Sequence, residues 1–241
     1  MKAAITIVTR RSADHARFLA PATKKGMMQM IEYPKIETLF KRDMEGSKQM
    51  IDGAYRDPTV EYLKDCQWEF TEKIDGANIG IVWDGYRVSF QGRTERAQIP
   101  AHLMNKLNEL FGSVESEELF EQKFGDTEVI LFGEGYGTKI QAVGSLYRSD
   151  VSFILFDVYI PAQNLWLTRE SVNDIAKAFC VDAVPVIFSG TLDEGVSYVR
   201  EGHTSTIGAA PMEGLVGRPA TELRDRRGKR IMVKIKARDF K

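Results

Sequence analysis

The chain has 241 residues, of which 43% are hydrophobic and 28% are charged, and its formal net charge is −1. This composition is typical of a soluble globular protein with one large domain or two small ones. The longest apolar stretches, such as residues 151–160, are too short to cross a bilayer, and Asp157 interrupts this one, so we expect no membrane partner. The N-terminal sequence has no secretory signal pattern, and we expect a cytoplasmic protein.

Cys66 and Cys180 are far apart and form no C-x-x-C pair. This spacing argues against a disulfide framework and a cysteine zinc site. We predict that both are free thiols, buried in the protein and kept reduced in the cytoplasm.

Charge is distributed unevenly along the chain. Residues 217–241 contain ten Lys or Arg and three Asp or Glu, a net of +7, so the remainder has a net charge of −8. A basic segment on an acidic body suggests contact with phosphate, although a solvated basic tail has the same composition.

The first 32 residues differ in character from the rest of the chain. They are basic and rich in methionine, with no readable fold, and we predict an N-terminal extension over residues 1–32. No repeat or long linker follows, so residues 33–241 are predicted to form one domain.

Periodicity and turn residues predict a mixed series of elements in the first half of the domain. Pro58 begins a short helix, and a strand covers residues 68–74. A hairpin covers residues 78–92, where Asp84-Gly85 suits a type I′ turn. Two helices then follow, over residues 100–111 and 115–124.

The second half continues in the same way. A buried strand is expected to end in a glycine-rich turn near Glu134, and Thr168 is expected to cap a helix. The other predicted elements are strands at 151–159, 184–188 and 229–237 and a helix at 192–201. Strands and helices alternate without a regular βαβ rhythm, so the predicted class is α+β, with mainly antiparallel sheets flanked by helices.

Lys73 is the first candidate for chemistry. On a strand, Lys73 and Asp75 share a face and Ile74 points to the other, toward the core. A lysine beside a cleft is a nucleophile when its amine is neutral, and nearby cations favour that form. The plainer interpretation is a surface strand with alternating charges.

Lys234 and Lys236 are two residues apart and are expected to project from one strand face, while Val233 and Ile235 face the core. Two such lysines repel each other, and a triphosphate would compensate their charge. Lysines that protect a sheet edge from aggregation give the same pattern.

Three further residues stand at element boundaries. Glu134 and Glu213 lie next to glycines, where the backbone can approach a ligand closely, and each is suited to a ribose hydroxyl or a divalent cation. Arg93 follows the hairpin and is suited to a phosphate. Taken one at a time, each of these three residues is equally typical of an ordinary turn or surface position.

The order of these motifs resembles that of the covalent nucleotidyltransferase superfamily, which includes polynucleotide ligases and capping enzymes. The matching stretches, in chain order, are "EKIDGAN", "GRT", "LFGEG", "FILFDVY", "EGLVGRP" and "VKIKA". The chain has no Walker A motif, and "GEGYG" lacks the spacing of a dinucleotide fingerprint.

Within this superfamily the sequence is most similar to ATP-dependent RNA ligases of the phage RNA ligase 2 type. Asn78 stands five residues after Lys73, where that family has asparagine and DNA ligases have arginine. The stretches "GRTERAQIP", "FGEGYGTKIQ" and "KIKARDF" also resemble that family. Asp75, in contrast, matches DNA ligases.

The resemblance implies the adenylyltransferase fold of polynucleotide ligases and a role for each matching residue. Lys73 would take AMP in a phosphoramide bond, and Lys234 and Lys236 would grip the α-phosphate. Glu213 would support the metal, and Arg218 is a weaker candidate for a phosphate contact. The other implied nucleotide contacts are Glu72, Ile74, Asn78, Arg93, Glu134, Phe156 and Val216.

The implied activity is joining of RNA 3′-hydroxyl and 5′-phosphate ends, as in RNA repair on a nicked or bridged duplex, with ATP and Mg²⁺. Two alternatives remain open: a minimal DNA ligase or capping-type guanylyltransferase, and a non-catalytic nucleotide- or RNA-binding module with the same fold. Many relatives continue past the strand of Lys236 into a nucleic-acid-binding domain, so adenylylation is expected more firmly than complete end joining.

Overall fold

The computed structural model describes residues 30–46 and 49–240. The chain from Ile31 to Lys241 forms one compact unit. The predicted extension, residues 1–32, lies almost entirely outside the described residues, so the extension and a domain boundary at residue 33 stay predictions.

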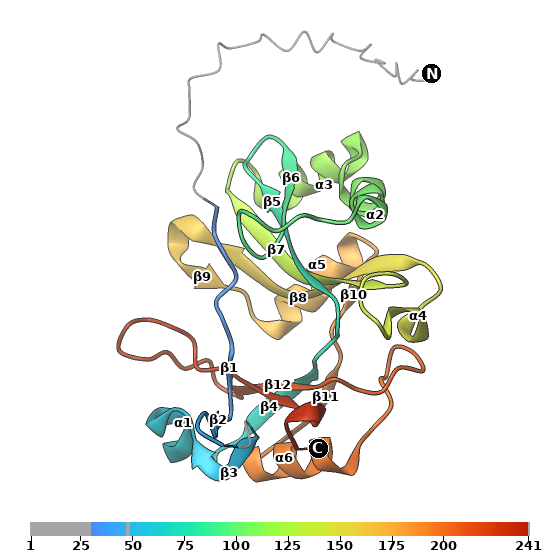
Figure 1. The fold of residues 1–241 in the computed structure, drawn as a ribbon. Coiled ribbons are helices and arrows are strands. Elements are labelled where there is room, and N and C mark those ends of the chain that lie inside the picture. The colour runs from blue at the N-terminus through green and yellow to red at the C-terminus, as the bar shows by residue number, and fades with distance from the viewer. Residues whose placement is uncertain (1–29, 47–48, 241) are drawn as a thin grey trace, which may run out of the picture. The chain divides into compact units, whose positions relative to one another are not determined.

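Two mainly antiparallel sheets make up the unit, which confirms the predicted α+β class (Figure 1). The five-stranded sheet has the order β1 (Glu37–Thr38), β13 (Val233–Lys236), β12 (Gly214–Pro219), β4 (Trp68–Glu72) and β11 (Val186–Gly190). The six-stranded sheet has the order β10 (Asp182–Ala183), β8 (Val151–Ile160), β7 (Val129–Gly137), β5 (Ala77–Trp83) and β6 (Val88–Gln91), and β9 (Leu165–Trp166) pairs with β8. Only β1 with β13 and β10 with β8 pair in parallel among the described strands.

Each sheet has its own core. Apolar residues of the six-stranded sheet pack against α2 (Ala101–Phe111), α3 (Val114–Phe124) and α5 (Arg169–Ala178). Those of the five-stranded sheet pack against α6 (Leu192–Glu201) and the small sheet of β2 (Phe40–Arg42) and β3 (Met50–Tyr55). The remaining short helices are α1 (Pro58–Tyr62), α4 (Gly144–Tyr147), η1 (Pro161–Gln163) and η2 (Ala237–Phe240).

The helix boundaries follow the local chemistry predicted from the sequence. Pro58 is the first residue of α1, and the side chain of Thr168 accepts a hydrogen bond from the backbone of Ser171 at the start of α5. Leu103 and Leu107 are fully buried on one face of α2, which ends at Gly112. These are local signals, and they are confirmed.

The predicted hairpin forms from β5 and β6, but its turn differs from the prediction. A type I′ turn needs a positive φ at both central residues. Of the loop residues between Trp83 and Val88, only Gly85 has one, at 96°. The side chain of Asp84 instead accepts hydrogen bonds from the backbone N–H groups of Tyr86 and Arg87, and these contacts determine the loop.

The glycine-rich stretch after Phe132 was predicted to be a turn, and this was wrong. β7 continues through it to Gly137, so Glu134 lies inside the strand and not at its end. A Cβ at Gly133 would meet the ring of Phe153 and the backbone of Ile154 on the neighbouring strand β8. The glycines therefore allow two buried strands to approach closely.

Two other features bear on the predicted surroundings of the protein. Cys66 and Cys180 are both free and exposed, so the prediction that they are buried was wrong. Within the described part of the chain, no helix has the length and apolarity needed to cross a membrane.

Candidate active site

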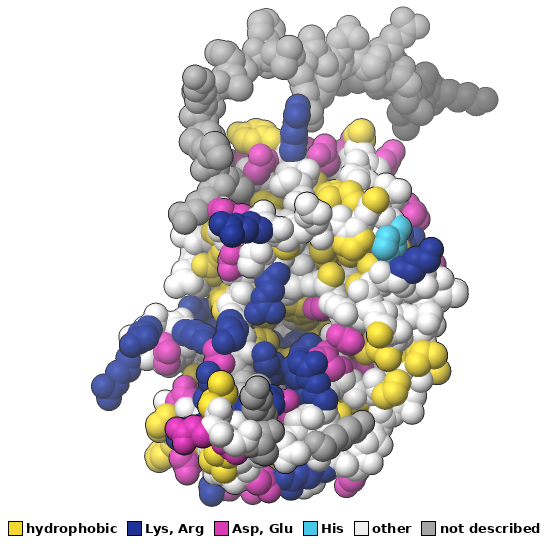
Figure 2. Space-filling view, in the orientation of Figure 1, with side chains coloured by type: hydrophobic (Ala, Val, Ile, Leu, Met, Phe, Trp, Pro, Cys, Tyr) yellow, Lys and Arg dark blue, Asp and Glu magenta, His cyan; other side chains and the backbone are white. Residues whose placement is uncertain are grey.

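A cavity of about 450 Å³ lies between the two sheets and takes its walls from both of them. In the space-filling view, Lys and Arg side chains gather around a hollow in the middle of this face (Figure 2). The cavity is lined by every residue that the sequence analysis singled out: Glu72, Lys73, Ile74, Asn78, Arg93, Glu134, Phe156, Glu213, Val216, Arg218, Lys234 and Lys236.

Lys73 lies on the segment that connects the two sheets. β4 ends at Glu72 and β5 begins at Ala77, so the predicted strand over residues 68–74 is too long by two residues. The three residues nevertheless alternate as expected, because Ile74 is buried in an apolar cluster with Tyr136 and Ile154, while Lys73 and Asp75 are partly buried and line the cavity. The backbone N–H of Lys73 donates to the carbonyl of Gly214 at 2.9 Å, which fixes the lysine at the start of β12.

Glu213 holds two lysines at once. Its Oε2 accepts from Lys73 Nζ at 2.6 Å, and its Oε1 lies 2.8 Å from Lys236 Nζ. The carbonyl of Glu213 also accepts from the backbone N–H of Ala237 at 2.9 Å. The ends of β4, β12 and β13 therefore bring two amines and one carboxylate together.

β13 presents its lysines as the sequence predicts. Val233 and Ile235 are buried, while Lys234 and Lys236 are only partly buried and face the cavity. On the neighbouring strand β12, Val216 and Arg218 alternate in the same way.

Burial and neighbouring charges shift the pKa values of several groups in the cavity. Burial raises the pKa of Glu134 to about 8, and the charges of Glu213 and Asp75 add to the increase, while Lys73 opposes it. Burial would also raise the pKa of Glu213, but Lys73 and Lys236 outweigh it and hold this pKa below its ordinary value.

The pKa values of Lys234 and Asp75 both shift in the direction that disfavours the charged form. Burial lowers the pKa of Lys234, and the nearby cations Lys236 and Lys73 lower it further. Burial and the charge of Glu213 raise the pKa of Asp75. An anion beside Lys234, or a cation among the carboxylates, would relieve this repulsion.

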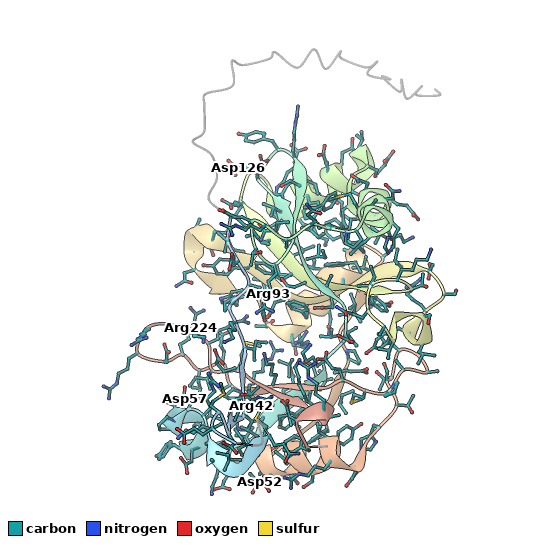
Figure 3. All side chains as sticks on the ribbon, viewed as in Figure 1. Arg42, Asp52, Asp57, Arg93, Asp126 and Arg224 are labelled. Carbon is teal, nitrogen blue, oxygen red and sulfur yellow. The ribbon has the colours of Figure 1, made fainter. Side chains whose placement is uncertain are left out.

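Glu134 and Asn78 lie directly opposite each other on the paired strands β7 and β5. Cross-strand partners share a face of the sheet, so both side chains reach the same part of the cavity. Arg93 comes just after β6, is exposed, and lies between the levels of the two sheets in the side-chain view (Figure 3).

A bulge in β8 turns two consecutive side chains toward the cavity. The register of β7 with β8 shifts between Phe132 and Gly133, so Phe156 has no partner residue on β7. Regular strands alternate their faces, whereas here both Phe156 and Asp157 line the cavity.

Asp157 is the centre of a buried network that sequence analysis did not foresee. Its carboxylate accepts from Tyr33 Oη at 2.5 Å and from both terminal nitrogens of Arg230 at 2.8 and 3.0 Å. Burial would raise the pKa of Asp157, but the charge of Arg230 and the hydrogen bonds from Arg230 and Tyr33 together outweigh it and lower this pKa. The ring of Tyr33 packs edge-on against Phe156, with 4.9 Å between ring centres.

Arg218 and Arg169 form the wall next to this network. Arg218 donates to Glu69 Oε1 at 2.7 Å, and Arg169 donates to the backbone carbonyl of Phe156 at 3.1 Å. Arg169 Nε also lies 3.6 Å from Glu69 Oε1, and this ion pair links α5 to β4 of the five-stranded sheet. Arg218 is thus paired with a carboxylate, that of Glu69.

Glu72 is a buried carboxylate with one free oxygen. Only 2% of the residue is exposed, and its Oε2 accepts from the backbone N–H and the hydroxyl of Thr206. Its Oε1 is buried and has no hydrogen-bond partner among the described residues. A ligand in the cavity with an N–H donor would satisfy it.

The sequence analysis missed Tyr33 and Asp157, which line the cavity, and Thr206, which holds Glu72. Asp157 had a usable signal, because a carboxylate inside an apolar strand requires a partner. Tyr33 and Thr206 had none, because their partners are 124 and 134 residues away in the chain.

The cavity between the two mainly antiparallel sheets combines seven Lys or Arg residues with five Asp or Glu residues, an excess of positive charge that suits an anionic ligand. The family model described as RNA ligase matches residues 67–236, and the chain belongs to the RNA ligase family. No curated protein matches the chain.

Solved structures of a Naegleria gruberi RNA ligase share the fold. A variant with AMP and Mn has 19% identity and a TM-score of 0.58, covering 86% of this chain and 62% of that one. A variant with ATP and Mn has 19% identity and a TM-score of 0.59, covering 87% and 58%, respectively. The structure with PPi has 20% identity and a TM-score of 0.57, covering 86% and 62%. This chain therefore spans less than two thirds of those relatives.

Proposed function

We propose that this protein is an ATP-dependent RNA ligase that joins RNA 3′-hydroxyl and 5′-phosphate ends. The observation that supports this most is the pairing of Lys73 and Lys236 with one carboxylate, that of Glu213, at 2.6 and 2.8 Å in a cavity between two sheets. Membership of the RNA ligase family and the fold shared with a ligase studied with ATP, AMP and PPi point the same way.

The proposed reaction begins with Lys73. Its neutral amine attacks the α-phosphorus of ATP, a nitrogen–phosphorus bond forms, pyrophosphate leaves, and the amine loses a proton. The AMP then passes from Lys73 to the 5′-phosphate of an RNA end. Attack by a 3′-hydroxyl on that end forms the phosphodiester bond and releases AMP.

Charge neutralisation is the main requirement of phosphoryl transfer. Seven Lys or Arg residues line the cavity against five Asp or Glu residues, an excess that suits an anion. Lys234 and Lys236 would grip the α-phosphate, with Arg93 on a phosphate or the ribose. Arg218 remains a weaker candidate, because Glu69 already accepts from it.

The nucleoside would lie between the two sheets. Phe156 would stack on the base and Val216 would line the opposite wall, with Ile74 beside them. Glu134 and Asn78, opposite each other on β7 and β5, would hold the ribose. The raised pKa of Glu134, about 8, suits a carboxyl group that exchanges hydrogen bonds with hydroxyls.

We infer that the free oxygen of Glu72 faces the 6-position of the bound purine and thereby favours ATP over GTP. Adenine presents an amino donor at its 6-position, where guanine presents an acceptor. The buried Oε1 of Glu72 lacks a donor among the described residues and would accept from that amino group.

A divalent cation fits the carboxylates of the cavity. Magnesium is typically bound by one or two carboxylates together with substrate phosphates. Glu213 would hold it, and the added positive charge would relieve the repulsion by Glu213 that adds to the effect of burial in raising the pKa of Asp75 and Glu134. When bound, the ion would withdraw charge from the phosphate groups.

The proposed substrates are RNA ends in a nicked or bridged duplex, and the proposed role is RNA repair in the cytoplasm. Sealing assays test this with nicked RNA and nicked DNA duplexes, each with ATP or GTP. An RNA ligase seals the RNA nick with ATP at least ten times faster than the DNA nick. Faster sealing of DNA would indicate a minimal DNA ligase. GMP transfer would indicate a guanylyltransferase, and no transfer at all a binding module.

A further inference from the structure

The connection between β12 and β13 is an ordered hairpin at the edge of the cavity. Over residues 223–231, here called the basic hairpin, the backbone N–H of Ile231 donates to Leu223 and that of Asp225 donates to Lys229, at 2.9 and 2.8 Å. The side chain of Asp225 accepts from the backbone of Arg227 and Lys229, at 2.8 and 2.9 Å. Gly228 supplies the positive φ of the turn, 78°.

Two arginines of the basic hairpin hold it in place. The Arg230 side chain is only 7% exposed, pairs with Asp157, and lies 3.7 Å from the ring centre of Trp166. Arg224, labelled in Figure 3, pairs with Glu222 and donates to the carbonyl of Asn164 at 3.3 Å. The base of the hairpin is therefore anchored to the six-stranded sheet.

Three positively charged side chains of the basic hairpin are available to bind another molecule. Arg226, Arg227 and Lys229 are exposed, and none forms an ion pair with a described residue. Asp225 attracts Arg227 and Lys229 electrostatically, but its carboxylate accepts hydrogen bonds from the backbone of the turn. A fixed turn with three unpaired cations maintains a local repulsion that an extended polyanion would relieve.

The basic hairpin is continuous with the candidate active site. Arg218 and Met232, which flank it in sequence, both line the cavity, and β13 leads from its base to Lys236. Lys236 is four residues after Met232, which corresponds to about 13 Å along a strand. In Figure 2, Lys and Arg side chains continue from the central hollow onto the protruding segment.

We propose that the basic hairpin binds the phosphate backbone of the RNA strand whose end lies in the cavity. A strand in a duplex presents one phosphate about every 3.4 Å of axis, so it spans the distance from Lys236 to the hairpin within a few nucleotides. Contacts of this kind position the strand and are independent of its base sequence. This inference rests on the proposed function, because it names the substrate surface of that site.

Salt-dependent RNA binding tests the inference. The triple variant Arg226→Gln/Arg227→Gln/Lys229→Gln is compared with the wild type on a labelled, nicked RNA duplex with a 5′-phosphate. The matched control is Lys41→Gln/Lys123→Gln/Lys177→Gln, which removes three exposed charges from β2, α3 and α5. AMP transfer to each protein is measured in parallel by intact mass.

We expect about tenfold weaker RNA binding for the hairpin variant at low salt. The slope of log affinity against log salt should fall in magnitude by about 2, because up to three phosphate contacts are lost. AMP transfer should stay unchanged, and the control variant should bind RNA like the wild type.

Several outcomes would overturn the inference: unchanged RNA affinity in the hairpin variant, an equal loss in the control, or no RNA binding by the wild type. A hairpin variant that loses affinity for polyglutamate but not for RNA would indicate an acidic protein partner instead. Failure of the proposed function would appear separately, as absence of AMP transfer in the wild type.

Discussion

Lys73 Nζ lies 2.6 Å from Glu213 Oε2, so the proposed nucleophile is held in an ion pair. The same carboxylate contacts Lys236 through its other oxygen at 2.8 Å. Glu213 therefore fixes the relative positions of two amines that come from different strands.

Replacing Glu213 tests this arrangement. In Glu213→Gln the charge that positions Lys73 and Lys236 is lost, and we expect AMP transfer to slow by about 100-fold. The rate is measured by single-turnover labelling with ATP. Glu118→Gln, an exposed change on α3, is the matched control and should react like the wild type. If Glu213→Gln transfers AMP at the wild-type rate, the charge of Glu213 is not needed to position Lys73 and Lys236.

Glu72 should determine which nucleotide is accepted. In Glu72→Gln the amide presents a donor as well as an acceptor, so the preference for an amino group at the purine 6-position weakens. We expect the ratio of AMP to GMP transfer to fall by about tenfold or more. Competition between the two nucleotides gives this ratio directly. An unchanged ratio would mean that another group recognises the base.

The raised pKa of Glu134 predicts a pH dependence of stability. Its folded pKa of about 8 is above the usual value of about 4.3 for the unfolded chain, so the folded protein retains a proton that the unfolded chain releases. The contribution of Glu134 to the free energy of unfolding is fully present below about pH 4.3 and is lost as the pH rises toward 8.

Urea unfolding at pH 5 and pH 8 measures this effect in the wild type and in Glu134→Gln. The wild type should lose more unfolding free energy over this interval than the variant, by at most about 1.4 kcal/mol per pH unit. Glu118→Gln again serves as the control. Equal losses in the wild type and Glu134→Gln would show that Glu134 does not retain the proton.

The buried pair of Asp157 and Arg230 should contribute strongly to stability. Arg230→Met leaves a buried carboxylate without its cation, and we expect a loss of about 3–5 kcal/mol in unfolding free energy. The double variant Asp157→Asn/Arg230→Met should lose less than the sum of the single changes. Because the pKa of Asp157 is lowered, this stabilisation is present above about pH 3.9 and is lost as the pH falls further.

An exposed ion pair provides the comparison for this prediction. Arg56 pairs with Glu37 at 3.2 Å, with 46% and 36% of the side chains exposed. Arg56→Met should cost at most about 1 kcal/mol. Similar losses for Arg56→Met and Arg230→Met would contradict a special role of burial at Asp157.

Local chemistry made much of the fold predictable. Pro58 and Thr168 begin helices at the expected positions, and the alternation of residues 233–236 presents both lysines to one side. The order of motifs likewise predicted residues that lie around one cavity. The roles of these residues remain predictions.

Long-range contacts account for what the sequence did not reveal. β7 continues through Gly133 because the neighbouring strand fills the space of a side chain, which no local pattern indicates. The bulge at Phe156 depends on how strand β8 pairs with strand β7. The contact of Tyr33 with Asp157 joins residues 124 positions apart. The exposure of both cysteines was likewise not predictable from spacing alone.

The most direct test of the account is the intact mass of the protein after incubation with Mg²⁺ and either ATP or GTP. The variants are Lys73→Arg, which keeps a cation beside Glu213 but removes the nucleophilic amine, and Lys123→Arg as a matched control on α3. We predict that the wild type and Lys123→Arg gain one AMP with ATP and nothing with GTP, while Lys73→Arg gains nothing. An AMP adduct on Lys73→Arg, or no adduct on the wild type, would contradict Lys73 as the nucleophile of an ATP-dependent ligase.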